Sequence, residues 1–411
     1  MKLDAIVADK DDDAPRLVLA DALQEQGDPR GEFLSIQCET ERLGLGPPRI
    51  FRDWLRDGLA GEAKTSPRLG KLLRREAELL RAHGKAWAGE AHAFAKDAWV
   101  FRRGFVEQLG FGKKTQTLAQ AFAAAPLVET VHHFGDWLDA LRVREWWSGP
   151  EVSRLRELYL PGAGTELAAF AELAALAGLR RLSLNHAGGP HDLVALARAH
   201  FASTLSGLVV TCMKLEAAST RTTLERMRAL TELQLIDTRL GVTGAGALAA
   251  LEFPSLEVLA VRHGKIGDEG ARMLLDAPYA PRLRALDLRK NGLTDAGGIL
   301  ERCPRLAVLE LSGNPLGESL ASWIGAAAPE LDVLGFEGCG LVDADVKALV
   351  ASPAWSRLGV LDLRKNKLTD ASARVLAKAA GPRLRALHVG GNALTVAGKK
   401  ALKTLSARVY A

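Results

Sequence analysis

The stretch that decides the fold is LRALDLRKNGLTDAGG, residues 283–298, which returns as LGVLDLRKNKLTDASA at residues 358–373. Both copies open with LxxLxL, in which leucines alternate with polar residues as on a strand with one buried face. Asn291 and Asn366 follow at the same offset, where an asparagine can bond backbone groups of its own turn and the next. The Thr-Asp pair that comes after them is typical of a helix start. Each copy predicts a strand, a turn and a helix.

The LxxLxL pattern occurs ten times, at steps of 23 to 27 residues. A period of this length indicates one supersecondary unit stacked on copies of itself. Since no single unit can bury its own apolar face, the copies must share one continuous core. The first leucines of the ten copies are Leu155, Leu179, Leu205, Leu230, Leu256, Leu283, Leu306, Leu331, Leu358 and Leu384.

These units resemble leucine-rich repeats of the ribonuclease-inhibitor type, LxxLxLxxN/CxL followed by a helix. The Asn/Cys position holds Asn291, Asn314, Cys339, Asn366 and Asn392 in the last five copies, but Ala163, Ala187, Met213, Thr238 and Gly264 in the first five. The early turns must therefore satisfy their backbone in another way. The resemblance implies an α/β fold, a horseshoe-shaped leucine-rich-repeat solenoid over residues 152–411. Its parallel sheet lies on the concave face, and helices of about two to three turns lie on the convex face.

The first 110 residues carry no repeat. Residues 11–33, DDDAPRLVLADALQEQGDPRGEF, predict two helices around a Gly-Asp-Pro-Arg-Gly turn, with Asp12 or Asp13 as the first cap. Residues 69–84 predict a basic helix, and residues 99–109 a strand or β-ribbon. The motif resembles the repeat-companion domain that precedes repeat arrays in bacteria, which implies a small, mainly helical domain and no known activity.

The segment between them, residues 111–151, is predicted to connect and cap the solenoid of ten repeats. Terminal repeats need a cap, and Trp137, Trp146 and Trp147 are large enough to supply one. Sealing the core is a more economical role for them than forming a ligand cage.

Charge is uneven in the N-terminal quarter. Residues 1–45 hold 5 Lys and Arg against 11 Asp and Glu, a net charge of −6, whereas residues 46–114 hold 15 against 8, a net charge of +7. One interpretation is that the two segments pack together with their charges partly paired. The other is that the acidic helices form a docking face.

Composition favours a cytoplasmic protein that binds neither nucleic acid nor a membrane, and a monomer. The net charge is +5, and lysines and arginines are dispersed without a basic run. Acidic residues interrupt the start of the chain, so it does not read as a secretory signal, and no stretch of 18 apolar residues predicts a membrane span. The four cysteines are far apart in sequence, which fits a reducing compartment.

We find no catalytic motif in the sequence and predict neither an enzyme nor a cofactor. The patterns GxxxxGK[ST], HExxH, GxSxG and CxxC do not occur. His132 and His133 are adjacent on a predicted strand, so they point to opposite faces and cannot easily share a metal ion. These histidines are better read as structural or surface residues, and no metal site is predicted.

The residues that flank the strand leucines should point out of the concave sheet. Two interpretations are open for this surface. Asp287 with Arg289 and Asp362 with Arg364 could neutralise each other in place, or the face could bind a partner, because a curved solenoid creates an extended concave site. The predicted partner-binding residues are Tyr159, Asn185, Gln234, Ile236, Arg262, His263, Asp287, Arg289, Glu310, Glu337, Asp362, Arg364 and His388.

The predicted function is binding of a protein partner, and two alternatives stay open. Some repeat proteins of this type activate small GTPases, which would require an arginine placed at the nucleotide; Arg262, Arg289 and Arg364 are candidates. The other alternative is an assembly role carried by the N-terminal domain.

Overall fold

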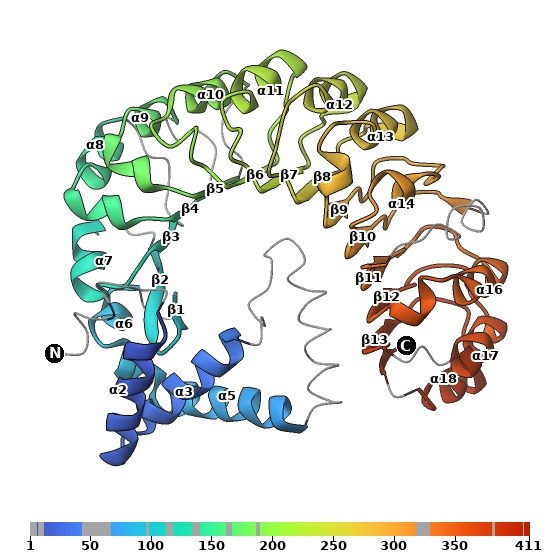
Figure 1. The fold of residues 1–411 in the computed structure, drawn as a ribbon, viewed down its shortest axis with the longest axis horizontal. Helices are drawn as coiled ribbons and strands as arrows, with labels where there is room; N and C mark the ends of the chain where they lie inside the picture. Colours follow the sequence, from blue (N-terminus) through green and yellow to red (C-terminus); the bar gives the residue numbers. More distant parts are fainter. Residues whose placement is uncertain are drawn as a thin grey trace.

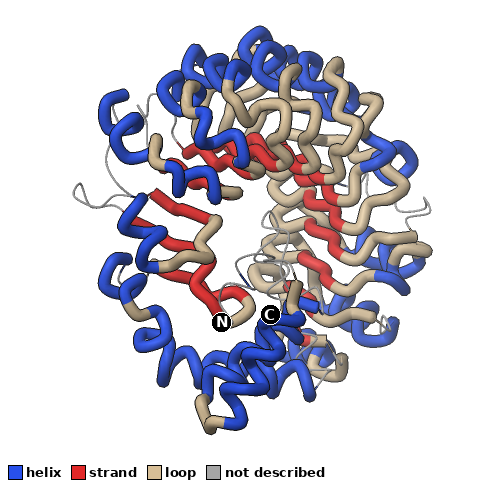
Figure 2. Tube along the Cα trace, turned by 60° about the vertical axis from the view of Figure 1, so that its left-hand side comes forward, coloured by secondary structure: helices blue, strands red, loops and turns tan. Residues whose placement is uncertain are grey.

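The computed structural model describes Ile6 and residues 12–42, 67–95, 98–111, 118–133, 140–161, 167–185, 190–317, 329–379, 383–405 and 407–411. Within these residues, one sheet of fourteen strands follows the order of the chain. It bends into a horseshoe with the strands on the inside and the helices on the outside (Figure 1). Figure 2 shows the strands lining the inner wall of the arch. The expected α/β solenoid is confirmed.

The strands are short because each repeat spends most of its residues on the turn and the return helix. Strand β14 was not predicted, since its sequence lacks the leucine pattern. The strands are β1 (Trp99–Arg102), β2 (Phe105–Phe111), β3 (Thr130–His133), β4 (Glu157–Pro161), β5 (Arg181–Asn185), β6 (Gly207–Thr211), β7 (Glu232–Ile236), β8 (Val258–Arg262), β9 (Ala285–Asp287), β10 (Val308–Glu310), β11 (Val333–Gly335), β12 (Val360–Asp362), β13 (Ala386–His388) and β14 (Arg408–Tyr410).

From β2 onward neighbouring strands are parallel and in register. Leu158 of β4 pairs with Leu182 of β5, which pairs in turn with Leu208 of β6. All three side chains are buried and point away from the concave side into one core that continues along the array. The leucine period thus sets both the spacing of the strands and their register.

The described helices that follow the repeat strands β4–β13 have four to ten residues, so the short helices expected from the repeat length are confirmed. They are α9 (Leu167–Ala171), α10 (Pro190–Ala195), α11 (Ala217–Leu224), α12 (Gly241–Ala249), α13 (Gly267–Leu275), α14 (Ile299–Arg302), α16 (Asp343–Ala351), α17 (Asp370–Ala379) and α18 (Val396–Leu402).

The repeated asparagines join consecutive turns. Asn366 Oδ1 accepts hydrogen bonds from the backbone amides of Cys339 (3.0 Å) and Leu341 (3.1 Å). Its Nδ2 donates to the carbonyl oxygens of Phe336 (2.8 Å) and Leu363 (3.0 Å). The expected bonding within the asparagine's own turn is confirmed, but the second turn is the preceding one and not the next. Each asparagine therefore supports two repeats at once.

Replacing Asn366 with alanine is expected to lower the free energy of unfolding by about 1–3 kcal/mol, because buried backbone groups lose their partners. Urea denaturation monitored by circular dichroism measures the change. Asn185→Ala, at an exposed asparagine on the end of β5, is the control and should unfold like the parent. If the Asn366→Ala curve also overlays the parent, this asparagine is not structural.

The early turns lack this device. Met213 occupies the asparagine position as a buried apolar side chain. Thr238 is also buried, and its hydroxyl has no hydrogen-bond partner among the described residues. Gly264 donates its amide to Asn291 Oδ1 of the following repeat, at 2.9 Å. Ala163 and Ala187 lie outside the described residues.

The N-terminal segment is helical, as expected, and it shares the sheet of the repeats. It contains α2 (Ala14–Glu25), α3 (Pro29–Arg42), α5 (Pro67–Ala88) and α6 (Glu90–Ala95). At the start of α2, Asp12 Oδ1 accepts a hydrogen bond from the amide of Ala14, at 2.9 Å. The ribbon predicted over residues 99–109 is the antiparallel pair β1–β2, and β2 then pairs in parallel with β3. The sheet therefore runs across both predicted domain boundaries, at residues 110/111 and 151/152.

The opposite charges of the N-terminal quarter are partly paired, as the first interpretation predicts. Arg75 on α5 contacts Glu32 on α3 at 2.7 Å. Arg68 contacts Glu39 at 2.6 Å. The basic helix thus lies against the acidic one, and charge pairing accompanies their packing.

The prediction that the tryptophans cap the end of the solenoid is wrong about their position. Trp147, on α8 (Ala140–Trp147), is fully buried and packs edge-on against Phe170 of α9, with ring centroids 5.2 Å apart. The predicted burial is confirmed, and Trp146 packs against the same core. Because β1, β2 and β3 precede β4 in the sheet, however, Trp147 fills the core inside the array and does not close its end. Trp137 lies outside the described residues.

Candidate functional site

The middle outward-facing residues of the repeat strands form a continuous row across the concave face, here called the inner row. Strand pairing sets them side by side and extends the row to His132 at one end and Tyr410 at the other. The inner row between these ends is Tyr159, Ser183, Val209, Gln234, Ala260, Asp287, Glu310, Gly335, Asp362 and His388.

The carboxylates of the inner row on β9 and β12 are neutralised in place. Asp287 is fully buried and receives Arg262 Nε at 2.5 Å and Arg289 Nη2 at 2.6 Å. Asp362 is equally buried and receives Arg364 Nη2 at 2.5 Å. Both guanidinium groups fold back onto these carboxylates, while the side chains stay partly exposed, 27% for Arg289 and 42% for Arg364. On β9 and β12, therefore, the aspartates and arginines of the concave face neutralise each other in place, as the first of the two interpretations predicts.

Glu310 lies between these two pairs in the row and has a different environment. It is 1% exposed, and its Oε1 accepts hydrogen bonds from the amide (2.9 Å) and hydroxyl (2.5 Å) of Ser312. Burial and the neighbouring charge of Asp287 raise the pKa of Glu310 to about 7. Burial therefore favours the protonated form of this carboxyl more than that of an exposed glutamate.

The remaining predicted residues of this half also have partners within the chain. Glu337 contacts Arg364 at 3.0 Å and Lys365 at 2.7 Å. His388 is 6% exposed and stacks on Tyr410, with ring centroids 4.2 Å apart. Sequence reasoning missed Tyr410, because β14 carries no leucine pattern.

A second line of residues on the concave face is apolar. It lies two residues before the inner row, on the same side of each strand, and forms a hydrophobic cluster distinct from the main core. This apolar line was detectable in the sequence, because the outward-facing position two residues before the inner row is apolar in each of these copies. This apolar stripe consists of Val258, Ala285, Val308, Val333, Val360 and Ala386.

The concave face over β4–β7 offers half-exposed and largely neutral side chains. Tyr159 is half-buried and stacks on His132, with ring centroids 3.8 Å apart and planes 11° apart. Ser183, Val209 and Ile236 are also half-buried, and Asn185 is exposed. We call this group the front strip: Tyr159, Ser183, Asn185, Val209 and Ile236.

An ion pair borders the front strip without giving it net charge. Arg181 of β5 reaches over β6 to Glu232 of β7, and the pair is bidentate. Gly207 lies between them on β6, where a side chain would collide with Arg181. Gln234 is buried and donates to Glu232 at 2.6 Å. This network was missed, because its partners are 51 residues apart.

The structure does not favour the GTPase alternative. An activating arginine must place its guanidinium at a nucleotide. Arg262, Arg289 and Arg364, the three candidates, are each held by a carboxylate of the concave face.

His263 follows β8 and lies on the edge of the arch. Its Nδ1 is 2.7 Å from Asp237 Oδ1, and both side chains are 44% exposed. Among the residues that the structure describes, no cluster of three or more His, Cys, Asp or Glu could hold a metal ion. Within the same residues, no helix combines the length and apolarity needed to cross a membrane.

Comparison with known proteins finds leucine-rich repeats in this chain. The family model described as "Leucine Rich repeat" matches residues 254–275 and 281–300. A ribonuclease inhibitor of Sus scrofa is 33% identical over 135 residues, which is 30% of this chain and 30% of that protein. The crystal structure of an internalin from Listeria monocytogenes covers 77% of this chain and 92% of its own, at 17% identity and a TM-score of 0.45.

The chain thus carries leucine-rich repeats, and its fold is a leucine-rich-repeat solenoid. It matches less than a third of the length of the ribonuclease inhibitor. Proteins built from leucine-rich repeats generally mediate protein–protein interaction.

Proposed function

We propose that this protein binds a protein partner on its concave face and that the front strip makes the central contacts. The observation that carries the proposal is the contrast between the two halves of the face. Over β9–β13 the carboxyl groups of the inner row are buried, and those of Asp287 and Asp362 are paired with arginines of the chain. Over β4–β7 the front-strip side chains are half-exposed or exposed, uncharged and partly apolar, and the neighbouring Arg181 and Glu232 are paired with each other.

Such a surface suits binding because its groups cost little to desolvate. A tyrosine supplies a large contact area with a polar end, and tyrosines are frequent hot spots. Tyr159 is already ordered by its stack on His132, so presenting it to a partner costs little conformational entropy. Val209 and Ile236 extend the apolar contact along the same strands.

The test is the affinity of full-length variants for a partner isolated with the full chain as bait. Tyr159→Ala should weaken binding about 30-fold or more, the effect of a hot-spot residue. Val209→Ala/Ile236→Ala should weaken it to a smaller extent. Val396→Ala removes an exposed valine from α18 on the convex side and serves as the control. Undiminished affinity in both front-strip variants would remove the site from this surface.

Truncation is a poor substitute for these point variants. Cutting the chain at residue 152 would remove β1, β2 and β3 and leave β4 as an unpaired edge. We therefore propose that the companion domain (1–110), the connecting segment (111–151) and the repeats (152–411) differ in sequence but do not fold separately. All three parts contribute to one sheet. We also propose that the protein is bacterial.

We also propose that the protein works as a monomer in a reducing, cytoplasmic setting. The four cysteines are free thiols, and Cys212 is exposed. An exposed thiol persists most readily where thiols are kept reduced.

A further inference from the structure

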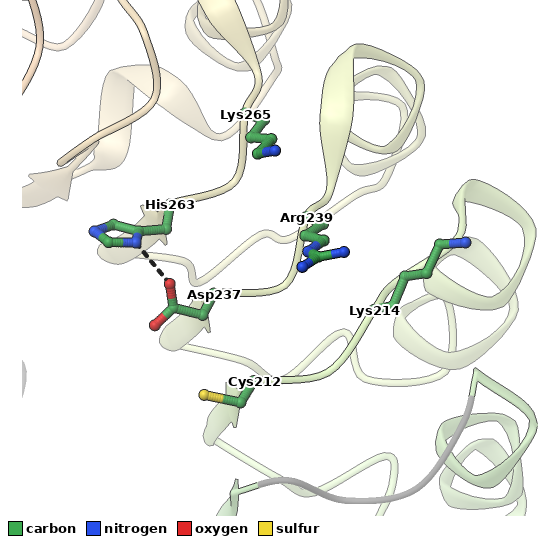
Figure 3. A pocket seen from close by; sticks show the side chains of 6 residues that line it. All are labelled: Cys212, Lys214, Asp237, Arg239, His263 and Lys265. Atoms are coloured by element: carbon green, nitrogen blue, oxygen red, sulfur yellow. Dashed lines mark ion pairs between the residues drawn. The ribbon is translucent and has the colours of Figure 1, made fainter.

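A recess of about 500 Å³ opens at one edge of the arch, beside the loops that follow β6, β7 and β8. Two residues from each loop line it, and Figure 3 shows them one loop after another along the array. The six residues are Cys212, Lys214, Asp237, Arg239, His263 and Lys265.

The lining is predominantly cationic. The repeat brings Lys214, Arg239 and Lys265 to equivalent positions of adjacent repeats, whose parallel strands lie about 4.8 Å apart. All three side chains are exposed, and none forms an ion pair with a described carboxylate. The single carboxylate of the lining, on Asp237, pairs with His263 instead. None of the three cations is paired with a described side chain, and with His263 counted as neutral the Asp237 carboxylate leaves the lining a net charge of +2.

The backbone of this recess is strained. Among the described residues, eight that are not glycine have a positive φ, and five of them line the recess. Arg239 and Lys265, for example, have φ of 48° and 56°, a conformation that costs free energy for any residue with a Cβ.

Two later repeats have glycine at the same loop position. Gly292 and Gly340 have φ of 75° and 80° there. In two consecutive loops the chain thus has a cationic residue at a position whose positive φ glycine would adopt without strain. Strain of this kind gathers at functional sites.

One of the helices that follow adds to the positive potential. α12 begins two residues after Arg239 and has no acidic residue in its first turn. The first turn of a helix carries a partial positive charge from its unpaired amides. The first turn of α13 instead holds Asp268 and Glu269, which oppose that partial charge.

We infer that this recess binds a compact anion that carries two or more phosphate groups. A phosphate group concentrates about two negative charges and several acceptor oxygens in a small volume, which suits three cations around one recess. Arginine and lysine are the usual partners of such groups. An acidic protein segment fits less well, because it spreads one charge per residue along an extended chain. The site is separate from the front strip and does not depend on partner binding there.

The test is isothermal titration of the full chain with inorganic tripolyphosphate at fixed ionic strength. One equivalent should bind. Arg239→Gly/Lys265→Gly should weaken binding about tenfold or more, since each lost charge-assisted hydrogen bond is worth that much. The same variant should melt at the parent temperature or above, because it relieves two left-handed side chains. Lost binding in this variant is then not a sign of unfolding.

The matched control is Lys290→Gly/Lys365→Gly. It removes the same charge from two left-handed positions outside the lining and should bind tripolyphosphate like the parent. No binding to the parent, or equal weakening in both double variants, would overturn the assignment. Tighter binding of a hexaglutamate peptide than of tripolyphosphate would also overturn it. A nucleoside triphosphate measured in parallel distinguishes a free polyphosphate from a larger phosphorylated ligand. Equal affinity for the two compounds indicates that only the phosphates are recognised. Higher affinity for the nucleoside triphosphate indicates that the recess also contacts the group that bears the phosphates.

Discussion

Replacing Trp147 with alanine is expected to lower the free energy of unfolding by about 3–5 kcal/mol, the usual cost of removing a large buried aromatic side chain. Trp147 is 0% exposed and packs edge-on against Phe170 in the core that β3 and β4 share. Its removal should leave a cavity where the N-terminal strands join the repeats. Urea denaturation monitored by circular dichroism measures the effect.

Trp146→Ala is the matched control, since Trp146 is only half-buried at the neighbouring position. It should destabilise the protein clearly less. Equal losses for the two variants, or a Trp147→Ala protein as stable as the parent, would contradict the packing described for α8.

Reversing Arg364 to glutamate is expected to lower the free energy of unfolding by about 3 kcal/mol. Asp362 is buried and has Arg364 as its ion-pair partner, and breaking a buried pair leaves an uncompensated charge that costs about 3–5 kcal/mol. The lower end applies because the Arg364 side chain is 42% exposed. The new carboxylate would also face Glu337. Thermal and urea unfolding of the full chain measure the loss.

Lys365→Glu provides the same charge reversal one residue away. Lys365 is 72% exposed and pairs only with Glu337 among the described residues, and such surface pairs contribute about 0–1 kcal/mol. If Arg364→Glu is no more destabilising than Lys365→Glu, the inner row is not held by its internal ion pairs.

The fold could be predicted from the sequence because its cause is local and periodic. Each LxxLxL unit specifies a strand, so ten copies at one period specify a solenoid, and the asparagines of the later copies specify their turns. The N-terminal strands were harder to place. The pair β1–β2 carries no leucine pattern, and its continuity with β3 depends on packing between segments that the sequence does not relate.

The chemistry of the concave face was less predictable, because its contacts cross between repeats. Arg181 meets Glu232 only after the chain has passed through two more strands, and Gly207 makes room for that contact. The pairing of Arg289 and Arg364 with the neighbouring aspartates was left open, because a pattern of alternation gives the direction of a side chain and not its partner. Arg16, which is fully buried and contacts Glu107 at 3.2 Å, had no signal in the sequence.

The cationic recess was hidden in the sequence for a simpler reason. Lys214, Arg239 and Lys265 appear dispersed along the chain, but their separations of 25 and 26 residues match the repeat. Aligning the copies beyond the leucine and asparagine positions would have brought the three together. The repeat spacing that predicts the fold therefore also predicts that these three side chains lie on adjacent repeats.

The most direct test of the proposed function is site-specific photo-crosslinking of the full chain to its partner. A benzophenone side chain introduced at Ser183, in the middle of the front strip, should form a covalent adduct with the partner. The same group at Lys347, exposed on α16 of the convex side, should form none. An adduct from Ser183 alone is the predicted result. An adduct from Lys347 and none from Ser183 would contradict the claim that the concave face over β4–β7 binds the partner.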